Sequence, residues 1–104
     1  MKADTLKGHL DALVLATLRA EPAHGYRVIE RLKLRSEGAF DLAEGTVYPV
    51  LHRLEAEGLL ASTWSTVGGR RRRVYRLTRR GQAALGERQD EWRRFAAAVE
   101  SVLT

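Results

Sequence analysis

Arginines gather in one segment of the chain, and these are the first residues whose type and spacing could do chemistry. Residues 70–80 hold seven arginines and no acidic residue, whereas the rest of the sequence has 11 basic and 13 acidic residues. The net charge of +5 therefore comes from this segment alone. Guanidinium groups bind phosphate through paired hydrogen bonds and enter narrow grooves of DNA. The segment indicates a polyanionic partner.

A second group lies in residues 44–58, EGTVYPVLHRLEAEG. Its apolar residues recur at the spacing of the buried stripe of a helix: Val47, Val50, Leu51 and Leu54. The opposite side and its edges carry small, aromatic and hydrogen-bonding residues: Gly45, Thr46, Tyr48, Pro49, His52, Arg53 and Ala56. Because proline has no backbone donor, we expect Pro49 in the first turn of a helix that begins near Gly45 or Thr46 and stops at Gly58.

The outward face of this helix has the chemistry to read DNA. Thr46 can contact a thymine methyl group or a base acceptor, and Tyr48 and His52 can donate hydrogen bonds to bases or phosphates. We expect Arg53 to clamp a phosphate. Taken alone, the helix fits an ordinary solvated surface equally well. The arginine run that follows one element later, without acidic partners, favours a recognition helix beside a phosphate-binding segment.

A third group is an apolar seam near the C-terminus, where Leu85, Trp92 and Val99 fall seven residues apart. A core of this size cannot cover the whole seam, so we expect a second copy of the chain to cover it. The residues assigned to this homodimer interface are apolar: Leu10, Leu13, Leu85, Trp92, Phe95, Val99 and Val102. Trp92 either packs in the interface or stacks a planar aromatic ligand against its symmetry mate, and packing is the commoner role.

Other kinds of site find no support in the sequence. There is no cysteine, and the three histidines lack the spacing of metal ligands. No catalytic constellation, dinucleotide fingerprint or P-loop occurs, so we expect neither an enzyme nor a cofactor. No apolar run approaches a membrane span and no signal peptide opens the chain, which predicts a cytoplasmic protein.

The elements that must position these groups can be placed from periodicity and capping. Helices are expected over His9–Arg19, over about His24–Arg35, and from near Gly45 or Thr46 to Gly58. The second is expected to bury Tyr26, Ile29 and either Leu32 or the stem of Lys33. A strand over Leu60–Val67 and a returning strand over Val74–Leu77, joined by the glycine pair Gly68-Gly69, form a hairpin with Arg70–Arg73 at its tip. Trp64 packs this hairpin on a helix. Thr78 is expected to cap a long helix that reaches nearly to Thr104.

This order predicts a mainly α fold with a β-hairpin. The first three helices form a helix-turn-helix core, and the hairpin lies beside the third helix as a wing. Residues 1–78 are expected to bind DNA, residues 79–104 to form a long dimerisation helix, and the two together to make one compact domain.

Several segments, in order, resemble the PadR family of bacterial transcriptional regulators over about residues 10–81. They are Leu13–Leu18, His24-Gly25-Tyr26, Gly45–Pro49, Leu51–Leu59, Gly69-Arg70, Tyr75–Thr78 and Gly81. The string G-T-x-Y-P followed by L-x-R-L-E-x-x-G-L is highly specific. The single C-terminal helix resembles the short subfamily, in which that helix is the dimerisation element.

The resemblance implies a homodimeric winged-helix repressor bound to an inverted repeat in double-stranded DNA. Some short members use a tryptophan at the place of Trp92 to stack planar drugs, which implies a small aromatic effector. Together the residues and the resemblance assign these DNA contacts: Tyr26, Gly45, Thr46, Tyr48, Pro49, His52, Arg53, Gly69, Arg70, Arg71, Arg72 and Arg73. The wing is richer in arginine than the family pattern and lacks a proline that often follows its Gly-Arg pair. A nonspecific architectural DNA-binding protein and a protein-interaction adaptor remain the alternatives.

Overall fold

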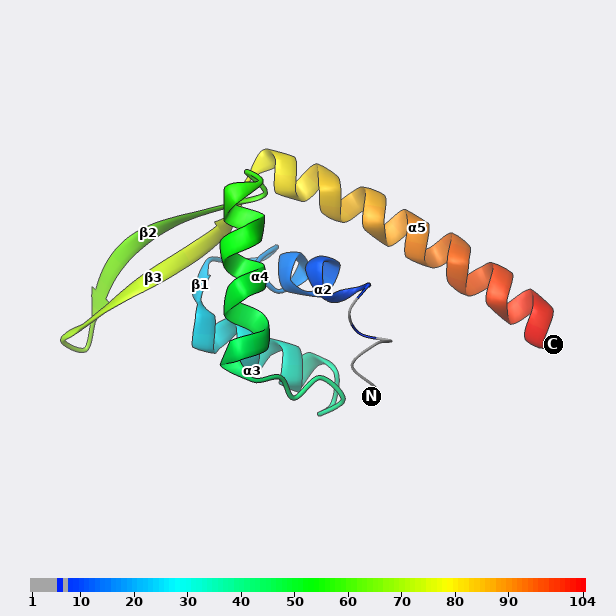
Figure 1. Cartoon of the computed structure of the whole chain (residues 1–104), viewed down its shortest axis with the longest axis horizontal. Coiled ribbons are helices and arrows are strands. Elements are labelled where there is room, and N and C mark those ends of the chain that lie inside the picture. The colour runs from blue at the N-terminus through cyan, green and yellow to red at the C-terminus, as the bar shows by residue number, and fades with distance from the viewer. Residues whose placement is uncertain (1–5, 7) are drawn as a thin grey trace.

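The computed structural model describes Leu6 and residues 8–104. Within these residues, four helices and a small sheet follow one another along the chain (Figure 1). Their order is α2 (Leu10–Thr17), β1 (Ala23–His24), α3 (Gly25–Arg35), α4 (Glu44–Ala56), β2 (Leu60–Val67), β3 (Arg70–Leu77) and α5 (Arg79–Leu103). The prediction of a mainly helical fold with a wing and a long C-terminal helix is confirmed.

The core forms where α2, α3 and α4 meet. Six fully buried aliphatic side chains come from these helices: Val14, Leu15, Val28, Val47, Leu51 and Leu54. Leu60, Tyr75 and Leu85 complete the core from β2, β3 and α5. The predicted stripe of α4 is buried at three of its four positions, and Val50 is only half-buried. Burial of apolar surface at this junction, at about 25 cal/mol per Å², holds the three helices together.

Helix α3 begins with a side-chain cap and ends in a left-handed turn. Nδ1 of His24 accepts a hydrogen bond from the backbone N–H of Arg27 at 3.3 Å. At the other end Glu37 and Gly38 have φ of 54° and 88°, and the N–H of Gly38 donates to the carbonyl of Lys33 at 2.8 Å. The prediction that Tyr26 is buried was wrong, because its side chain is 55% exposed and lies outside the core.

Helix α4 begins earlier than its proline indicated. It starts at Glu44 after the N-cap residue Ala43, so Pro49 lies in the second turn rather than the first. The carbonyl of Gly45 therefore lacks its usual helical partner, but Gly45 is exposed and water can serve it. The end is as predicted: Gly58 has φ of 79°, and the N–H of Leu59 donates to the carbonyl of Leu54 at 2.9 Å.

The sheet has three antiparallel strands in the order β1-β3-β2. Strand β2 pairs with β3 over its whole length, from Leu60 opposite Leu77 to Val67 opposite Arg70. The turn is the pair Gly68-Gly69, with φ of 60° and 76°. Because a two-residue turn with positive φ at both positions closes a hairpin, Arg70–Arg73 form the first half of β3. The prediction of an arginine tip and a later strand start was wrong.

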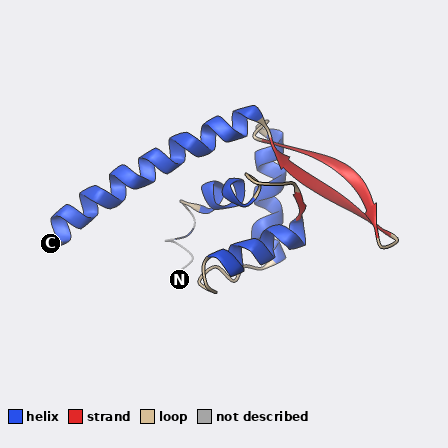
Figure 2. Ribbon diagram, turned by 180° about the vertical axis from the view of Figure 1, so that it is seen from behind, coloured by secondary structure: helices blue, strands red, loops and turns tan. Residues whose placement is uncertain are grey.

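Helix α5 starts against the end of α4 and then leaves the core. Oγ1 of Thr78 accepts a hydrogen bond from the N–H of Gly81 at 3.0 Å, which confirms the predicted cap. The helix is 25 residues long and runs out from the three-helix core, on the side away from the wing (Figures 1 and 2). Among the described residues, no helix is long and apolar enough to cross a membrane.

Candidate nucleic-acid interface

A groove lies between the wing and the N-terminal ends of α3 and α4. It has a volume of about 470 Å³ and brings aromatic residues together with the arginines of β3. Its lining comes from five elements, β1, α3, α4, β2 and β3: His24, Gly25, Tyr26, Tyr48, His52, Trp64, Arg70, Arg71, Arg72, Arg73 and Tyr75. Seven of these residues are among the DNA contacts assigned from the sequence. The remaining assigned residues, apart from Arg53, lie exposed on the first half of α4 or at the wing turn: Gly45, Thr46, Pro49 and Gly69.

In the groove the aromatic side chains of Tyr26 and His52 contact the ring of Tyr48, and Gly25 lies directly against that ring. A Cβ atom on Gly25 would lie 2.5 Å from a ring carbon of Tyr48, so only glycine lets α3 approach this ring. The ring of Tyr48 makes edge-to-face contacts with Tyr26 and His52, each with ring centroids 6.4 Å apart. The Gly25 approach therefore sets where these three polar rings lie in the groove.

Glu44 is a residue of this surface that the sequence pattern did not reveal. The carboxylate raises the pKa of the Tyr26 hydroxyl, as a hydrogen-bond acceptor and as a nearby negative charge. Burial raises the pKa of Tyr48, and the charge of Glu44 adds to that effect. Both hydroxyls are therefore protonated donors at neutral pH. In the sequence, Glu44 had only the signature of an acidic residue in the first turn of a helix.

Two wing arginines lie over an indole ring. The guanidinium carbons of Arg71 and Arg73 are 4.6 and 5.2 Å from the ring centroid of Trp64. The prediction that Trp64 packs the wing on a helix was wrong, because this side chain is 54% exposed and lines the groove. Nε of Arg73 also donates to the hydroxyl of Ser62 at 2.7 Å, and the Glu55 carboxylate lies 3.7 Å from its guanidinium.

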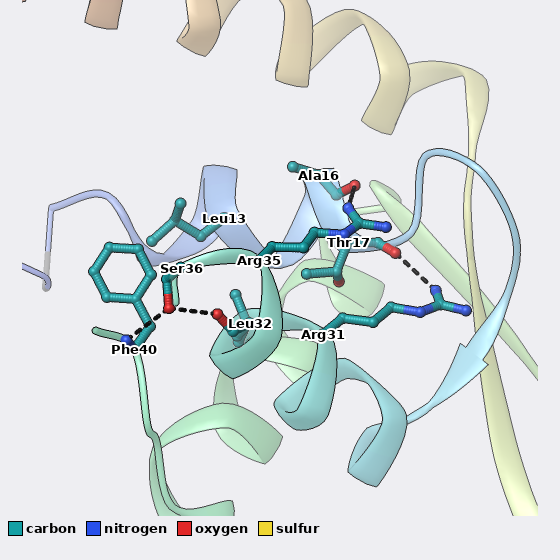
Figure 3. Close-up of a pocket in the computed structure, with 8 residues that line it drawn as sticks. All are labelled: Leu13, Ala16, Thr17, Arg31, Leu32, Arg35, Ser36 and Phe40. Carbon is teal, nitrogen blue, oxygen red and sulfur yellow. Dashed lines mark hydrogen bonds between the residues drawn. The ribbon is translucent and has the colours of Figure 1, made fainter. Parts of the chain in front are cut away.

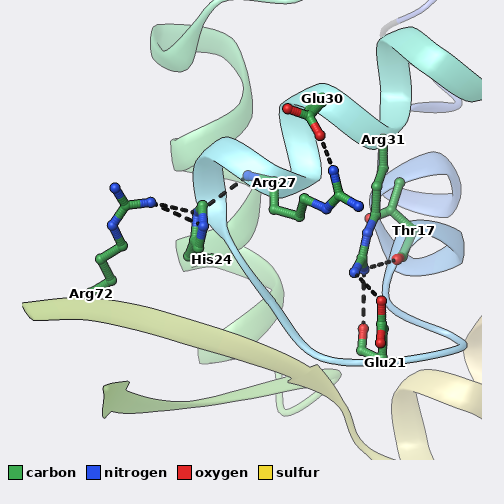
Figure 4. A network of polar contacts seen from close by, with 7 residues as sticks. All are labelled: Thr17, Glu21, His24, Arg27, Glu30, Arg31 and Arg72. Carbon is green, nitrogen blue, oxygen red and sulfur yellow. Dashed lines mark hydrogen bonds and ion pairs between the residues drawn. The ribbon is translucent and has the colours of Figure 1, made fainter. Parts of the chain in front are cut away.

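The wing is tied to α3 through His24. Nη1 of Arg72 lies 3.0 Å from Nε2 of His24 (Figure 4). Burial lowers the pKa of His24, and the positive charges of Arg72, Arg27 and Arg31 lower it further. The imidazole is therefore neutral at pH 7 and has one acceptor nitrogen, so its tautomer decides whether Nδ1 accepts from the N–H of Arg27 or Nε2 accepts from Arg72. Within the described residues, the ion pairs do not include Arg70, Arg71 or Arg72, whose charges are free for a polyanion.

Arg53 is not in the groove. Its guanidinium makes two hydrogen bonds to the Asp11 carboxylate, at 2.5 and 3.0 Å, and lies 3.4 Å from Glu57. The bonds to Arg53 lower the pKa of Asp11. Arg53 therefore joins α4 to α2 and already has a carboxylate where a phosphate was expected.

The buried Arg31 connects α3 to the turn that follows α2. Arg31 is only 7% exposed, and its guanidinium donates to the carbonyls of Thr17 and Glu21 at 2.8 and 3.1 Å and to the Glu21 carboxylate at 2.9 Å (Figure 4). These bonds fix the turn between α2 and β1 to the middle of α3. Sequence reasoning missed this contact because its partners are backbone carbonyls 10 and 14 residues away.

The apolar seam of α5 is exposed along most of its length. The exposed fractions of Trp92, Phe95, Val99 and Val102 are 52%, 59%, 37% and 86%. The Trp92 ring contacts His9 edge-to-face at 5.1 Å. Two residues that the sequence grouped with the seam, Leu10 and Leu85, lie elsewhere: they are 6% and 1% exposed and belong to the core of this chain.

Leu13, also assigned to the interface, lines a smaller groove of about 160 Å³ (Figure 3). Its other lining residues come from α2, α3 and the segment after α3: Ala16, Thr17, Arg31, Leu32, Arg35, Ser36 and Phe40. The hydroxyl of Ser36 donates to the Leu32 carbonyl at 2.7 Å and accepts from the N–H of Phe40 at 2.8 Å. The polar groups are thus mostly used within the fold. In the described part of the chain no three acidic or histidine residues gather as a metal site would require.

The sequence of this chain matches a known protein family. The family model of the transcriptional regulator PadR-like family matches residues 14–87. The transcriptional regulator Rv3488 of Mycobacterium tuberculosis is 52% identical over 64 residues, which make up 62% of this chain and 47% of that protein.

Solved structures agree with the family match. A PadR family transcriptional regulator from Eggerthella lenta is 36% identical with a TM-score of 0.83, covering 96% of this chain and 86% of that one. A transcriptional regulator from Clostridium thermocellum shares the fold, with a TM-score of 0.90 at 22% identity, over 98% of this chain and 100% of that one. The chain therefore belongs to the PadR-like family of DNA-binding transcriptional regulators.

Proposed function

We propose that the chain represses transcription as a homodimer bound to an inverted repeat in double-stranded DNA. One observation carries this proposal: the polar rings of α3 and α4 line the same groove as Arg70, Arg71 and Arg72, which make no ion pair within the described residues. Hydrogen-bonding side chains at the start of a recognition helix suit base edges, and guanidinium groups suit phosphates. Such a repressor works in the cytoplasm, on the nucleoid when it is bound to DNA.

Helix α4 supplies the base contacts in this proposal. Its exposed first half enters the major groove with Gly45, Thr46, Pro49 and His52, and Tyr48 donates a hydrogen bond from the groove. Tyr26 lies beside it, with its hydroxyl bonded to Glu44. A good base contact contributes roughly 1–3 kcal/mol of discrimination against a wrong base. The sequence-specific part of the binding energy therefore comes from α4.

The wing supplies the phosphate or minor-groove contacts. Arg70, Arg71 and Arg72 have no carboxylate within ion-pair distance among the described residues, so their charges are available for DNA. Gly69 allows the DNA backbone to come close to the turn. Arg53 leaves this set because Asp11 already occupies it.

A second copy of the chain covers the exposed seam of α5. In this account residues 1–78 bind DNA and residues 79–104 dimerise, through Trp92, Phe95, Val99 and Val102. A two-fold axis then places the two copies of α4 one helical turn of DNA apart, about 34–36 Å. A planar aromatic effector between the two Trp92 rings releases DNA if it binds better to a different spacing of the recognition helices.

Selection from random duplexes tests the proposal. The purified protein should enrich a two-fold symmetric sequence whose half-site centres lie about 10–10.5 base pairs apart. A reporter promoter that overlaps the selected sequence should lose expression when the protein is present. Enrichment of no sequence would leave a nonspecific architectural protein, and increased reporter expression would make the protein an activator.

A further inference from the structure

The carboxylate of Asp11 joins three helices. From α2 it accepts two hydrogen bonds from Arg53 of α4, at 2.5 and 3.0 Å, and it lies 3.2 Å from the guanidinium of Arg88 on α5. The Asp11 side chain is only 17% exposed, so this bridge is better shielded from water than the exposed pair Arg93–Asp90 on α5. The bridge connects the helix assigned to base reading with the helix assigned to dimerisation.

The same two helices also meet directly at the end of α4. Oγ1 of Thr78 donates to the carbonyl of Gly58 at 2.7 Å, and the N–H of Thr78 donates to the carbonyl of Leu59 at 3.2 Å. A Cβ atom on Gly81 would lie 2.0 Å from the Leu59 oxygen, so the two backbones touch at this point. This junction fixes where α5 starts, and Leu85, which is 1% exposed, packs the first turns of the helix on the core.

We infer that Asp11 is a positioning residue for DNA recognition, which fixes the angle between α4 and α5 and thereby the half-site spacing that the dimer reads. Arg53 lies five residues before Gly58 and Arg88 seven residues after Gly81, which are about 8 and 10 Å along their helices. The two arginines and the junction between Gly58 and Gly81 thus form a triangle, and Asp11 connects the two arginines. The bridge adds a polar contact between α4 and α5, farther from the junction than Leu85, to the apolar packing that holds α5 on the core.

The length of α5 makes this angle matter. At 1.5 Å per residue its 25 residues span about 37 Å, so a tilt of about 10° moves its far end by about 6 Å. One base pair corresponds to a shift of about 3.4 Å in half-site spacing. Since the exposed seam lies in the second half of α5, a loosened angle lets the dimer accept neighbouring spacings.

The inference rests on the proposed function, because it needs a dimer that reads two half-sites. The test measures affinity for the selected duplex, for versions with one base pair added or removed between the half-sites, and for a shuffled duplex. The wild-type protein should prefer one spacing by about tenfold or more. Asp11→Asn should weaken binding to the duplex with the preferred spacing about tenfold, so that the affinities for the three spacings become similar. Its affinity for the shuffled duplex should stay within about twofold of the wild-type affinity.

Two further variants make the result specific. Asp90→Asn removes the same charge from an exposed ion pair on α5 and should behave as wild type. Arg88→Gln keeps the bond between Asp11 and Arg53 and removes only the arm to α5, so it should also broaden the accepted spacings. If Asp11→Asn does not fold, the Arg88→Gln result decides alone.

The failures of the two proposals are distinguishable. A wild-type protein that binds selected and shuffled duplexes equally contradicts the proposed function. If the wild type discriminates, unchanged spacing preferences in Asp11→Asn and Arg88→Gln overturn the positioning role. Equal weakening on every duplex, together with a lower melting temperature, would also overturn it, because that pattern belongs to a residue needed only for folding.

Discussion

The Arg72 guanidinium of the wing lies 3.0 Å from Nε2 of His24, the residue that caps α3. His24 also pairs with Val74 in the short β1–β3 ladder. One imidazole thus contacts both the helix-turn-helix core and the wing, and it does so in its neutral form. The contact makes the stability of this junction depend on pH.

Stability is expected to fall as the pH drops below the ordinary histidine pKa of 6.5. Because burial and the nearby arginines lower the pKa of His24 in the folded protein, the unfolded chain binds the proton more readily. Its contribution is complete above the unfolded pKa and is lost as the pH falls toward the folded pKa. Urea unfolding between about pH 5.5 and 7.5 measures this slope.

The controls use the same method. His24→Asn keeps a capping side chain and should reduce the pH dependence over this range. His52→Asn, at an exposed position on α4, should leave it unchanged. Equal slopes in wild type and His24→Asn would show that this histidine does not carry the effect.

Two glycines of α5 are expected to respond oppositely to alanine. At Gly81 the new Cβ atom would lie 2.0 Å from the Leu59 carbonyl oxygen, so the chains must move apart, at a cost of about 1–3 kcal/mol. At Gly86 nothing lies within 4 Å of it, and alanine should stabilise the helix by about 0.5–1 kcal/mol. Free energies of unfolding of Gly81→Ala and Gly86→Ala would reveal the difference. A Gly81→Ala protein as stable as wild type would contradict the close contact at the junction.

Removing the free charges of the wing should weaken binding to all DNA sequences alike. Alanine at Arg70, Arg71 and Arg72 should lower the slope of log K against log salt by about 0.9 for each phosphate that the wing no longer neutralises. Arg93→Ala, on α5, is the matched control and should leave the slope unchanged. Titrations at several salt concentrations measure it, and an unchanged slope in the triple variant would remove the wing from the proposed interface.

A charge in the exposed seam should separate the dimer. Val102 is 86% exposed in the single chain, and Val102→Glu would place a carboxylate in the proposed interface. Light scattering should give the mass of two chains for wild type and of one chain for the variant. Leu34→Glu, on the exposed side of α3, is the control and should remain dimeric. A dimeric Val102→Glu protein would place the interface elsewhere.

The sequence predicted those features of the fold that depend on local spacing and capping. Val47, Leu51 and Leu54 lie one helical turn apart and are buried, and Gly58 and Thr78 mark the end of α4 and the start of α5. Each of these signals involves residues within a few positions of one another. The prediction that the returning strand begins at Val74 was wrong, because the strand begins at Arg70, directly after the turn. The Gly68-Gly69 turn, and not the side chains, sets the register of the hairpin.

Local spacing and capping could not predict contacts between residues that lie far apart in the sequence. Arg53 has the pattern of a phosphate contact, but its carboxylate partner Asp11 lies 42 residues earlier. Tyr26 and Trp64 are large aromatic residues of the kind usually buried, but both are exposed. Tyr26 contacts the ring of Tyr48 at the groove, and Trp64 lies under arginines of β3. Leu85 follows the heptad pattern, yet the first turns of α5 pack against the core and bury it. In each case tertiary packing decided the outcome.

The measurement that tests the central claim most directly is fluorescence anisotropy with DNA from upstream of the protein's own gene and with a shuffled duplex. Both are titrated between about 50 and 200 mM salt, where phosphate-driven affinity falls steeply. The account predicts a preference of about 10³ or more for the native DNA, with a steep salt slope. Binding that is absent, or that does not change with salt, would contradict the claim that this groove binds DNA and would favour a protein-interaction adaptor.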